Sequence, residues 1–145
     1  MGEKMISKKI NTELNKQLNQ EFDSAYLYVS MSKYCTKIGY DKFKARLLEK
    51  ACKHSSRAKH IYDYIIGNLG KIEIEVQDNS RATWINKSDL LNDVIRTKKL
   101  NQKSYHYLLN LTTELSDKKT FEFVKLLNNS LANPIQGRPQ EVTNN

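Results

Sequence analysis

The sequence predicts an all-α protein, a long four-helix bundle with one long crossover between its second and third helices. The chain of 145 residues holds only five glycines and two prolines, too few for the many turns of a β-sandwich or barrel. Apolar residues recur every three or four positions over long stretches, which is the period of an amphipathic helix. Two such stretches, an interval of about twenty residues without that period, and two further stretches give the connectivity of a bundle with one crossover.

The first helix is expected to begin after Ser7, which can cap it, and to run to about Thr36, before Gly39. Asp41 can cap the second helix, which the pair Gly67 and Asn68 closes. Segments of about 28 residues extend roughly 42 Å as helices, too long for a compact globin-like packing.

Residues 69–87 show no helical period, but Ile72, Ile74 and Val76 alternate as in an extended strand, so we expect a long extended crossover. Ser88 is the expected cap of the third helix. A turn at 117–119 leads to a short fourth helix from Thr120 to about 131. Pro134 ends it, because the residue before proline is driven out of the α region. We therefore expect one bundle domain over residues 1–133 and a polar tail over 134–145.

The composition limits the cellular setting and leaves the meaning of the charge open. No apolar run approaches the length that spans a bilayer, and no secretory signal is recognisable at the start, so a cytoplasmic protein without membrane segments is expected. The two cysteines, without a CxxC pair, are expected to stay reduced. The net charge of +8 indicates either attraction to phosphate or nucleic acid, or a lysine-rich and asparagine-rich codon bias with no ligand.

Four polar residues interrupt the apolar stripes near the middle of the helices: Glu21, His54, Arg57 and Asn101. A buried carboxylate is costly unless it is paired or coordinated, so this level of the core is either a metal site or a buried polar network. Arg57 favours the network, because a guanidinium has no lone pair for a metal and can bind a carboxylate through two N–H groups. The sequence therefore predicts an ion pair between Glu21 and Arg57.

Several segments resemble the bacterial non-haem ferritins. Residues 14–32, LNKQLNQEFDSAYLYVSMS, are similar to the first helix of that family, and residues 60–72, HIYDYIIGNLGKI, to the end of its second helix and its entry into the crossover. Shorter matches fall at 99–102 and 120–123, so the resemblance covers roughly residues 7–131. It implies a ferritin-like bundle with a shortened fourth helix and no fifth helix, a homo-oligomer that can be a shell, and a role in iron storage or iron homeostasis.

The resemblance also implies where iron would be oxidised, and most of those ligands are replaced here. The family takes a Glu from the first helix, Glu-x-x-His from the second, and further Glu or Gln from the third and fourth. Glu21 matches, whereas the second-helix motif reads His54-Ser-Ser-Arg57 after Lys53, and Asn101 stands at the third-helix position. Tyr28, the tyrosine beside the family's site, is kept. The positions of this chain that are equivalent to the family's site are Glu21, Tyr28, Lys53, His54, Arg57 and Asn101.

An iron pair needs several hard carboxylate ligands, including one that bridges the two ions. We therefore expect a degenerate ferroxidase centre, with Glu21 and His54 as the remaining candidate metal ligands and no working oxidation site. His60 and His106 are a weaker candidate for metal elsewhere. Iron is the expected cargo, held weakly or as mineral; no haem and no nucleotide are expected.

Two further interpretations remain open at this stage. One is a cationic oligomer that binds DNA or another polyanion for stress protection, through Lys50, Lys53, Arg57 and Lys59 on the second helix. The other concerns the turn before the fourth helix, near the family's three-fold axis: Asp117 and Glu122 line an iron entry channel there, or are simply solvated polar residues.

Overall fold

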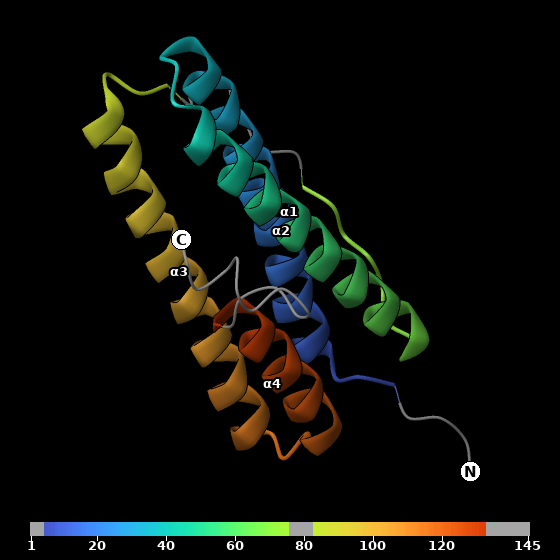
Figure 1. The fold of residues 1–145 in the computed structure, drawn as a ribbon. Helices are drawn as coiled ribbons and strands as arrows, with labels where there is room; N and C mark the ends of the chain where they lie inside the picture. The colour runs from blue at the N-terminus through green and yellow to red at the C-terminus, as the bar shows by residue number, and fades with distance from the viewer. Residues whose placement is uncertain (1–4, 76–82, 133–145) are drawn as a thin grey trace. The chain divides into compact units, whose positions relative to one another are not determined.

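The computed structural model describes residues 5–75 and 83–132, which form four α-helices and no strand. They are α1 (Lys8–Lys37), α2 (Asp41–Gly67), α3 (Lys87–Glu114) and α4 (Lys118–Ala132) (Figure 1). The chain divides into two compact units, Met1–Thr97 and Lys98–Asn145. The expected polar tail over 134–145 lies outside the described residues. Within the described part, no helix is long and apolar enough to cross a membrane.

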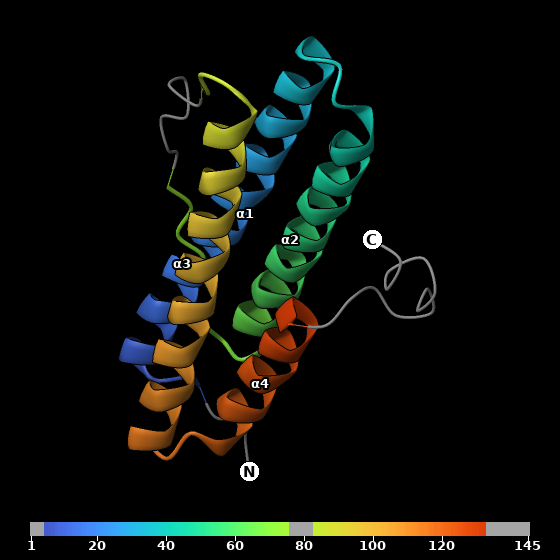
Figure 2. The same cartoon turned by 60° about the vertical axis from the view of Figure 1, so that its left-hand side comes forward.

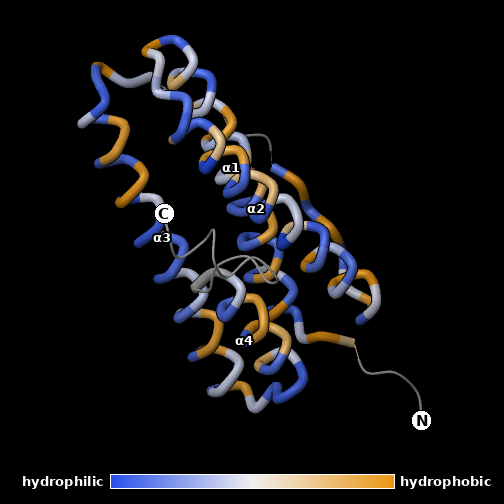
Figure 3. Tube along the Cα trace, in the orientation of Figure 1, coloured by the Kyte–Doolittle hydropathy of each residue, from blue (hydrophilic) through white to orange (hydrophobic). Residues whose placement is uncertain are grey.

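In the first unit α1 and α2 run side by side in opposite directions (Figure 2). Hydrophobic turns recur along both helices, as the predicted period requires (Figure 3). Burying a leucine or isoleucine side chain stabilises the folded state by about 1.5–3 kcal/mol. This pair buries nine alanine, leucine and isoleucine residues, none of them more than 8% exposed. They are Ile10, Leu14, Leu18, Ala25, Leu47, Ala51, Ala58, Ile61 and Ile65.

At one end of the pair, the residues that precede α3 and its first turns join the same core. Leu90 is fully buried in a cluster with Tyr28, Met31 and Cys35, and Trp84 packs against it. The Trp84 indole Nε1 donates to Asp93 Oδ2 at 2.9 Å. This partly buried ring, with its polar atom satisfied, fixes the entry of the chain into α3.

The helix starts agree with the sequence at one place and differ at three. Ser7 caps α1 as predicted, its Oγ accepting from the Ile10 amide at 3.1 Å. Asp41 is the first residue of α2 rather than its cap, and Tyr40 at the cap position makes no side-chain cap bond. The other two differences are at Ser88, the expected cap of the third helix, and at Thr120, the expected start of the fourth.

Both α3 and α4 start earlier than predicted because a capping residue lies upstream of the expected start. The Asn86 side chain accepts from the Asp89 amide at 2.9 Å, so α3 begins at Lys87 and Ser88 lies inside it. Asp117 Oδ1 accepts from the Thr120 amide at 3.0 Å and Oδ2 from the Thr120 hydroxyl at 2.7 Å. Asp and Asn are strong N-caps, so these two residues set the boundaries.

Three helices end in the same way, with one residue in the left-handed region and a pair of closing hydrogen bonds. After α2, the Gly70 amide bonds to the Ile65 carbonyl at 2.8 Å and the Leu69 amide to the Ile66 carbonyl at 3.1 Å. The same pattern follows α1 and α3, and it satisfies carbonyls that the helix leaves free. The left-handed residues are Gly39 (φ 74°), Leu69 (φ 63°) and Ser116 (φ 56°).

The described part of the crossover, residues 69–75, is extended as predicted and is attached to α1 by a ladder of asparagines. Asn15 donates to the Lys71 carbonyl at 2.7 Å and accepts from the Glu73 amide at 2.6 Å. Asn19 repeats this one helical turn later with the Glu73 carbonyl (2.8 Å) and the Glu75 amide (2.7 Å). Four helical residues rise about 6 Å and two extended residues about 6.6 Å, so the two periods match.

Gly70 begins this ladder at a point where the backbone approaches α1 closely. A Cβ placed on Gly70 would lie 2.3 Å from Asn11 Oδ1, which accepts from the Lys71 amide, and 2.8 Å from Ile65 Cγ2. Only glycine fits there without displacing the ladder.

The second unit holds the rest of α3 and the whole of α4. The chain reverses direction after Glu114, and α4 returns alongside α3 in both views (Figures 1 and 2). Its buried apolar residues are Tyr105, Leu108, Leu111, Val124 and Leu127. At 15 residues against 30 for α1, the fourth helix is short, as expected.

Candidate functional site

The polar residues predicted on the stripes of α1 and α2 meet inside the first unit. Glu21 lies midway along α1 and is fully buried. His54 and Arg57, one turn apart on α2, are each 4% exposed. Because the two helices are antiparallel neighbours, their midpoints share one level of the core, and the three side chains contact each other there.

Glu21 contacts side chains of both helices at this level. Its Oε1 lies 2.6 Å from His54 Nδ1, while Oε2 accepts from Arg57 Nε at 3.3 Å and from Gln17 Nε2 at 3.5 Å. The ion pair predicted between Glu21 and Arg57 is therefore confirmed. Gln17, four residues before Glu21 on the same face of α1, was not singled out in the sequence, although its i, i+4 spacing is a usable signal.

The electrostatics of His54 favour a neutral ring. Burial lowers its pKa from the ordinary 6.5; the hydrogen bond and charge of Glu21 oppose this, and the charges of Arg57 and Lys50 add to the lowering. At neutral pH the imidazole is therefore uncharged, and its Nδ1–H donates to Glu21. Arg57 Nη2 lies 3.2 Å from His54 Nδ1. The network thus contains one anion and one cation, and its net charge is zero.

Tyr28 covers this network on one side. Its ring stacks on the His54 ring, with centroids 5.3 Å apart and an interplanar angle of 18°. Lys50 Nζ lies 6.0 Å from the centroid of the Tyr28 ring. Burial, with the charge of Asp93 next in importance, raises the pKa of Tyr28 to about 12, so the phenol keeps its proton at neutral pH.

The donor set at this level does not suit a pair of iron ions. Among residues 5–75 and 83–132, no group of three or more His, Cys, Asp or Glu side chains could hold a metal ion. Glu21 is the carboxylate of the network, and its two oxygens are engaged by His54 and Arg57. Binding of a metal ion to Glu21 or His54 would require Arg57 to move. A role of these two residues as metal ligands stays a prediction.

The other basic residues proposed on α2 lie in different surroundings. Lys53 is half-buried, whereas Lys59 is exposed and pairs with Asp63 at 2.8 Å. Arg57, proposed to contact a polyanion, is instead buried against Glu21. His60 is exposed.

The second unit contains the remaining predicted positions. Asn101 is buried at 1% exposure on α3, and His106 is exposed on the same helix. Both carboxylate oxygens of Asp117 accept hydrogen bonds that cap α4. Glu122 is exposed and lines an open hollow of about 340 Å³; its other lining residues are Thr112, Thr113, Ser116, Lys118 and Phe121. A channel role for Asp117 and Glu122 stays a prediction.

Comparisons with known proteins agree with this architecture. The ferritin-like domain family matches residues 11–129. Bacterial non-heme ferritins from two strains of Staphylococcus epidermidis are each 30% identical over 128 residues, covering 86% of this chain and 73% of theirs. An open pore ferritin from the archaeon Archaeoglobus fulgidus superposes with a TM-score of 0.82 at 24% identity, over 88% of this chain and 77% of that one.

A humanized archaeal ferritin gives the same values as the open pore protein: a TM-score of 0.82, 24% identity, and 88% and 77% of the two chains. At this identity the structural likeness establishes the fold, a ferritin-like four-helix bundle. The sequence matches establish more, since they cover most of the chain and include a relative of 30% identity. The chain belongs to the ferritin family of iron-storage proteins.

Proposed function

We propose that this chain is a ferritin subunit that handles iron without oxidising it at the centre of its own bundle. The observation that carries the proposal is the contact of Glu21 with both Arg57 and His54. A fixed guanidinium here takes the role that a metal cation has in stabilising the buried carboxylate. The buried carboxylate of Glu21 therefore needs no metal ion as its counter-charge.

The charges of the network support this proposal. Two ferrous ions bring four positive charges, which hard carboxylate ligands must balance. The carboxylate of Glu21 is already balanced by Arg57, and opposite charges about 4 Å apart interact far more strongly in a protein interior than in water. Iron at Glu21 would have to displace the guanidinium and then lie beside an uncompensated cation.

Assembly with further copies is part of the proposal. Phe22, Tyr26 and Val29 follow each other at steps of four and three on α1, and they are 43%, 51% and 48% exposed. An exposed apolar stripe of this kind suits burial against another subunit. Iron would then enter as cargo, with dissolved dioxygen as the electron acceptor that oxidises it, either slowly during mineralisation or at a catalytic subunit of a mixed assembly.

The proposal treats residues 1–133 as one ferritin-like domain with a polar tail after it, in line with the family match over residues 11–129. A cytoplasmic location fits the free thiols of Cys35 and Cys52.

Binding of phosphate, DNA or another polyanion through α2 is less well supported, since Arg57 faces Glu21 and Lys59 pairs with Asp63.

Aerobic Fe(II) oxidation tests the proposal. Ferrous iron is added to the assembled protein in air, and ferric absorbance is followed at several subunit concentrations, beside an unrelated protein of similar charge. We expect no fast phase proportional to subunit concentration. A fast phase that disappears in Glu21→Ala and persists in the surface variant Glu114→Ala would overturn the proposal. Native mass measurement and iron analysis of the same preparation test the assembly and the cargo.

A further inference from the structure

The middle of α3 lacks acidic residues altogether. Between Asp93 and Glu114 the sequence contains neither Asp nor Glu, although Lys98, Lys99 and Lys103 fall in that interval. A helix that serves only as a solvated face usually mixes charges of both signs. An interval that carries only positive charge attracts an anionic partner.

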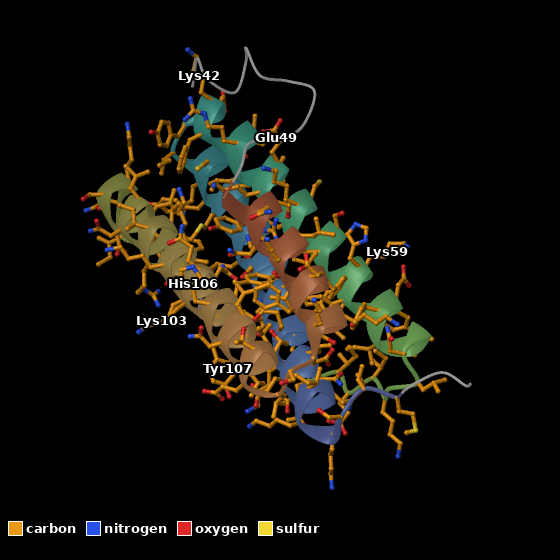
Figure 4. All side chains as sticks on the ribbon, turned by 90° about the horizontal axis from the view of Figure 1, so that it is seen from below. Lys42, Glu49, Lys59, Lys103, His106 and Tyr107 are labelled. Carbon is orange, nitrogen blue, oxygen red and sulfur yellow. The ribbon has the colours of Figure 1, made fainter. Side chains whose placement is uncertain are left out.

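The helical period places part of this interval on a single exposed face. Lys99, Lys103, His106 and Asn110 follow each other at steps of four, three and four, and all four are exposed. Tyr107 flanks them and is 48% exposed. We call these five residues the α3 strip, and Figure 4 shows Lys103, His106 and Tyr107 along one side of α3.

Neighbouring carboxylates do not neutralise the lysines of the α3 strip. Exposed lysines elsewhere pair within their helix, as Lys9 does with Glu13 at 3.2 Å and Lys59 with Asp63 at 2.8 Å. Within the described residues, no salt bridge involves Lys99 or Lys103. Their charge is therefore available to an external anion.

We propose that the α3 strip binds single-stranded nucleic acid. Lys99 and Lys103, one turn apart, neutralise successive phosphates; the exposed ring of Tyr107 stacks on an unpaired base; and the Asn110 amide donates to the backbone or to a base edge. A positive track with an aromatic platform is the combination that binds single strands with little sequence preference. A paired base offers no free face to Tyr107, so duplex DNA should bind less tightly.

The opposite face of α3 argues against a lipid surface as the partner. An interfacial helix must present a continuous apolar face to the acyl chains. In α3 the apolar residues Tyr105, Leu108 and Leu111 are at most 7% exposed because the protein itself covers them. The exposed Ile95 (54%) and Leu100 (51%) each have a lysine three positions later on the helix, so they form no continuous apolar face. The α3 strip shares no residue with the Glu21 network, so this inference is independent of the proposed lack of ferroxidase activity.

Fluorescence anisotropy of a labelled oligo-dT, titrated with the full-length protein at several salt concentrations, tests the proposal. Each phosphate contact on a single strand contributes about 0.7 to the slope of log K against log salt. Lys99→Gln/Lys103→Gln should therefore lower that slope by about 1.4 and weaken binding on the order of tenfold at low salt. Tyr107→Ala should weaken binding by about tenfold without changing the slope, and Tyr107→Phe should bind as the native chain does.

Matched controls separate the α3 strip from net charge and general aromatic exposure. Lys8→Gln/Lys42→Gln removes two charges from exposed lysines of the first unit, and Tyr62→Ala removes another exposed ring. Both should leave the affinity and the salt slope near the native values. The proposal fails if the native chain does not bind oligo-dT, if the control pair loses as much as the strip pair, or if duplex DNA or anionic phospholipid vesicles bind as tightly at the same salt.

Discussion

Glu21 Oε1 lies 2.6 Å from His54 Nδ1, in a core where the carboxylate is fully buried and the imidazole is 4% exposed. The other oxygen of the same carboxylate faces Arg57. One buried acid therefore depends on two basic partners from the neighbouring helix, and each partner has a separate, measurable consequence.

Arg57→Ala should lower the free energy of unfolding by about 3–5 kcal/mol, because it leaves a buried carboxylate without its counter-charge. The double variant Glu21→Gln/Arg57→Met, which removes both charges and keeps the volume, should recover most of that loss. Urea unfolding followed by circular dichroism measures both. Arg46→Ala, an exposed arginine on the same helix, is the control and should change stability by less than about 0.5 kcal/mol. Equal losses in the single and double variants would show that packing rather than charge is responsible.

Stability should fall as the solution is acidified below pH 6.5. The pKa of His54 is lowered in the folded state, chiefly by burial. Below pH 6.5 the unfolded chain therefore binds a proton at this residue before the folded chain does. The free energy of unfolding then decreases with falling pH, by up to about 1.4 kcal/mol per pH unit, until the folded pKa is reached. His54→Gln should flatten this dependence between pH 6.5 and 5. His60→Gln, on an exposed ring, should not. A native slope that survives in His54→Gln would assign the pH dependence to other groups.

Much of the candidate site could be read from the sequence, because a helical stripe fixes which residues share a level. Glu21 and Arg57 interrupt apolar stripes near the middles of two long helices, and antiparallel packing then brings them together. The stacking of Tyr28 on His54 was not visible, since a tyrosine on a stripe indicates only burial. Three helix starts were misassigned where the sequence offers neighbouring candidates of similar capping strength, as with Asn86 and Ser88.

The crossover shows a different limit of sequence reading. Its alternation of Ile72 and Ile74 predicts an extended segment, yet Ile74 is 54% exposed and the backbone rather than the side chains makes the attachment. Backbone hydrogen bonds to asparagine side chains leave no apolar pattern to detect. The relevant signal was the spacing of Asn11, Asn15 and Asn19 at steps of four on α1.

Asn15→Ala should release the crossover from α1 locally. The substitution removes the donor to the Lys71 carbonyl and the acceptor of the Glu73 amide, so stability should fall by about 1–3 kcal/mol. Hydrogen exchange resolved to single amides should show faster exchange at Glu73 while the core of α2 stays protected. Asn92→Ala, on an exposed asparagine of α3, provides the comparison and should leave exchange at Glu73 unchanged. Unaltered exchange at Glu73 in Asn15→Ala would mean that the ladder does not hold the crossover.

The helix ends offer a stabilising change. Leu69 occupies the left-handed position after α2 at φ 63°, where a side chain with Cβ is strained by roughly 1–2 kcal/mol and glycine is not. Leu69→Gly should therefore raise the free energy of unfolding, by about 0.5–1 kcal/mol after the larger chain entropy of glycine is subtracted. Leu48→Gly, inside α2 on a comparably exposed leucine, should instead destabilise by about 1 kcal/mol. Thermal unfolding of the two variants should shift in opposite directions, and a shared downward shift would indicate that the Leu69 side chain contributes packing that offsets its backbone strain.

Making the network negatively charged tests whether Arg57 is what keeps metal out. His54→Glu/Arg57→His replaces a neutral ring and a cation by a carboxylate and an imidazole, so the level around Glu21 changes from net zero to two negative charges with an added nitrogen ligand. Carboxylate and imidazole are ligands that divalent iron accepts, and removal of the guanidinium removes the repulsion. Anaerobic titration with Fe(II), followed by calorimetry, should show a new site of about one ion per subunit in this variant, while the native chain shows none there. His54→Gln/Arg57→Met, neutral at both positions, is the matched control and should bind no better than the native chain. If that control gains the site as well, steric blocking by Arg57 rather than its charge excludes the metal; if neither variant binds, the geometry between α1 and α2, and not the substituted ligands, prevents metal from entering this core.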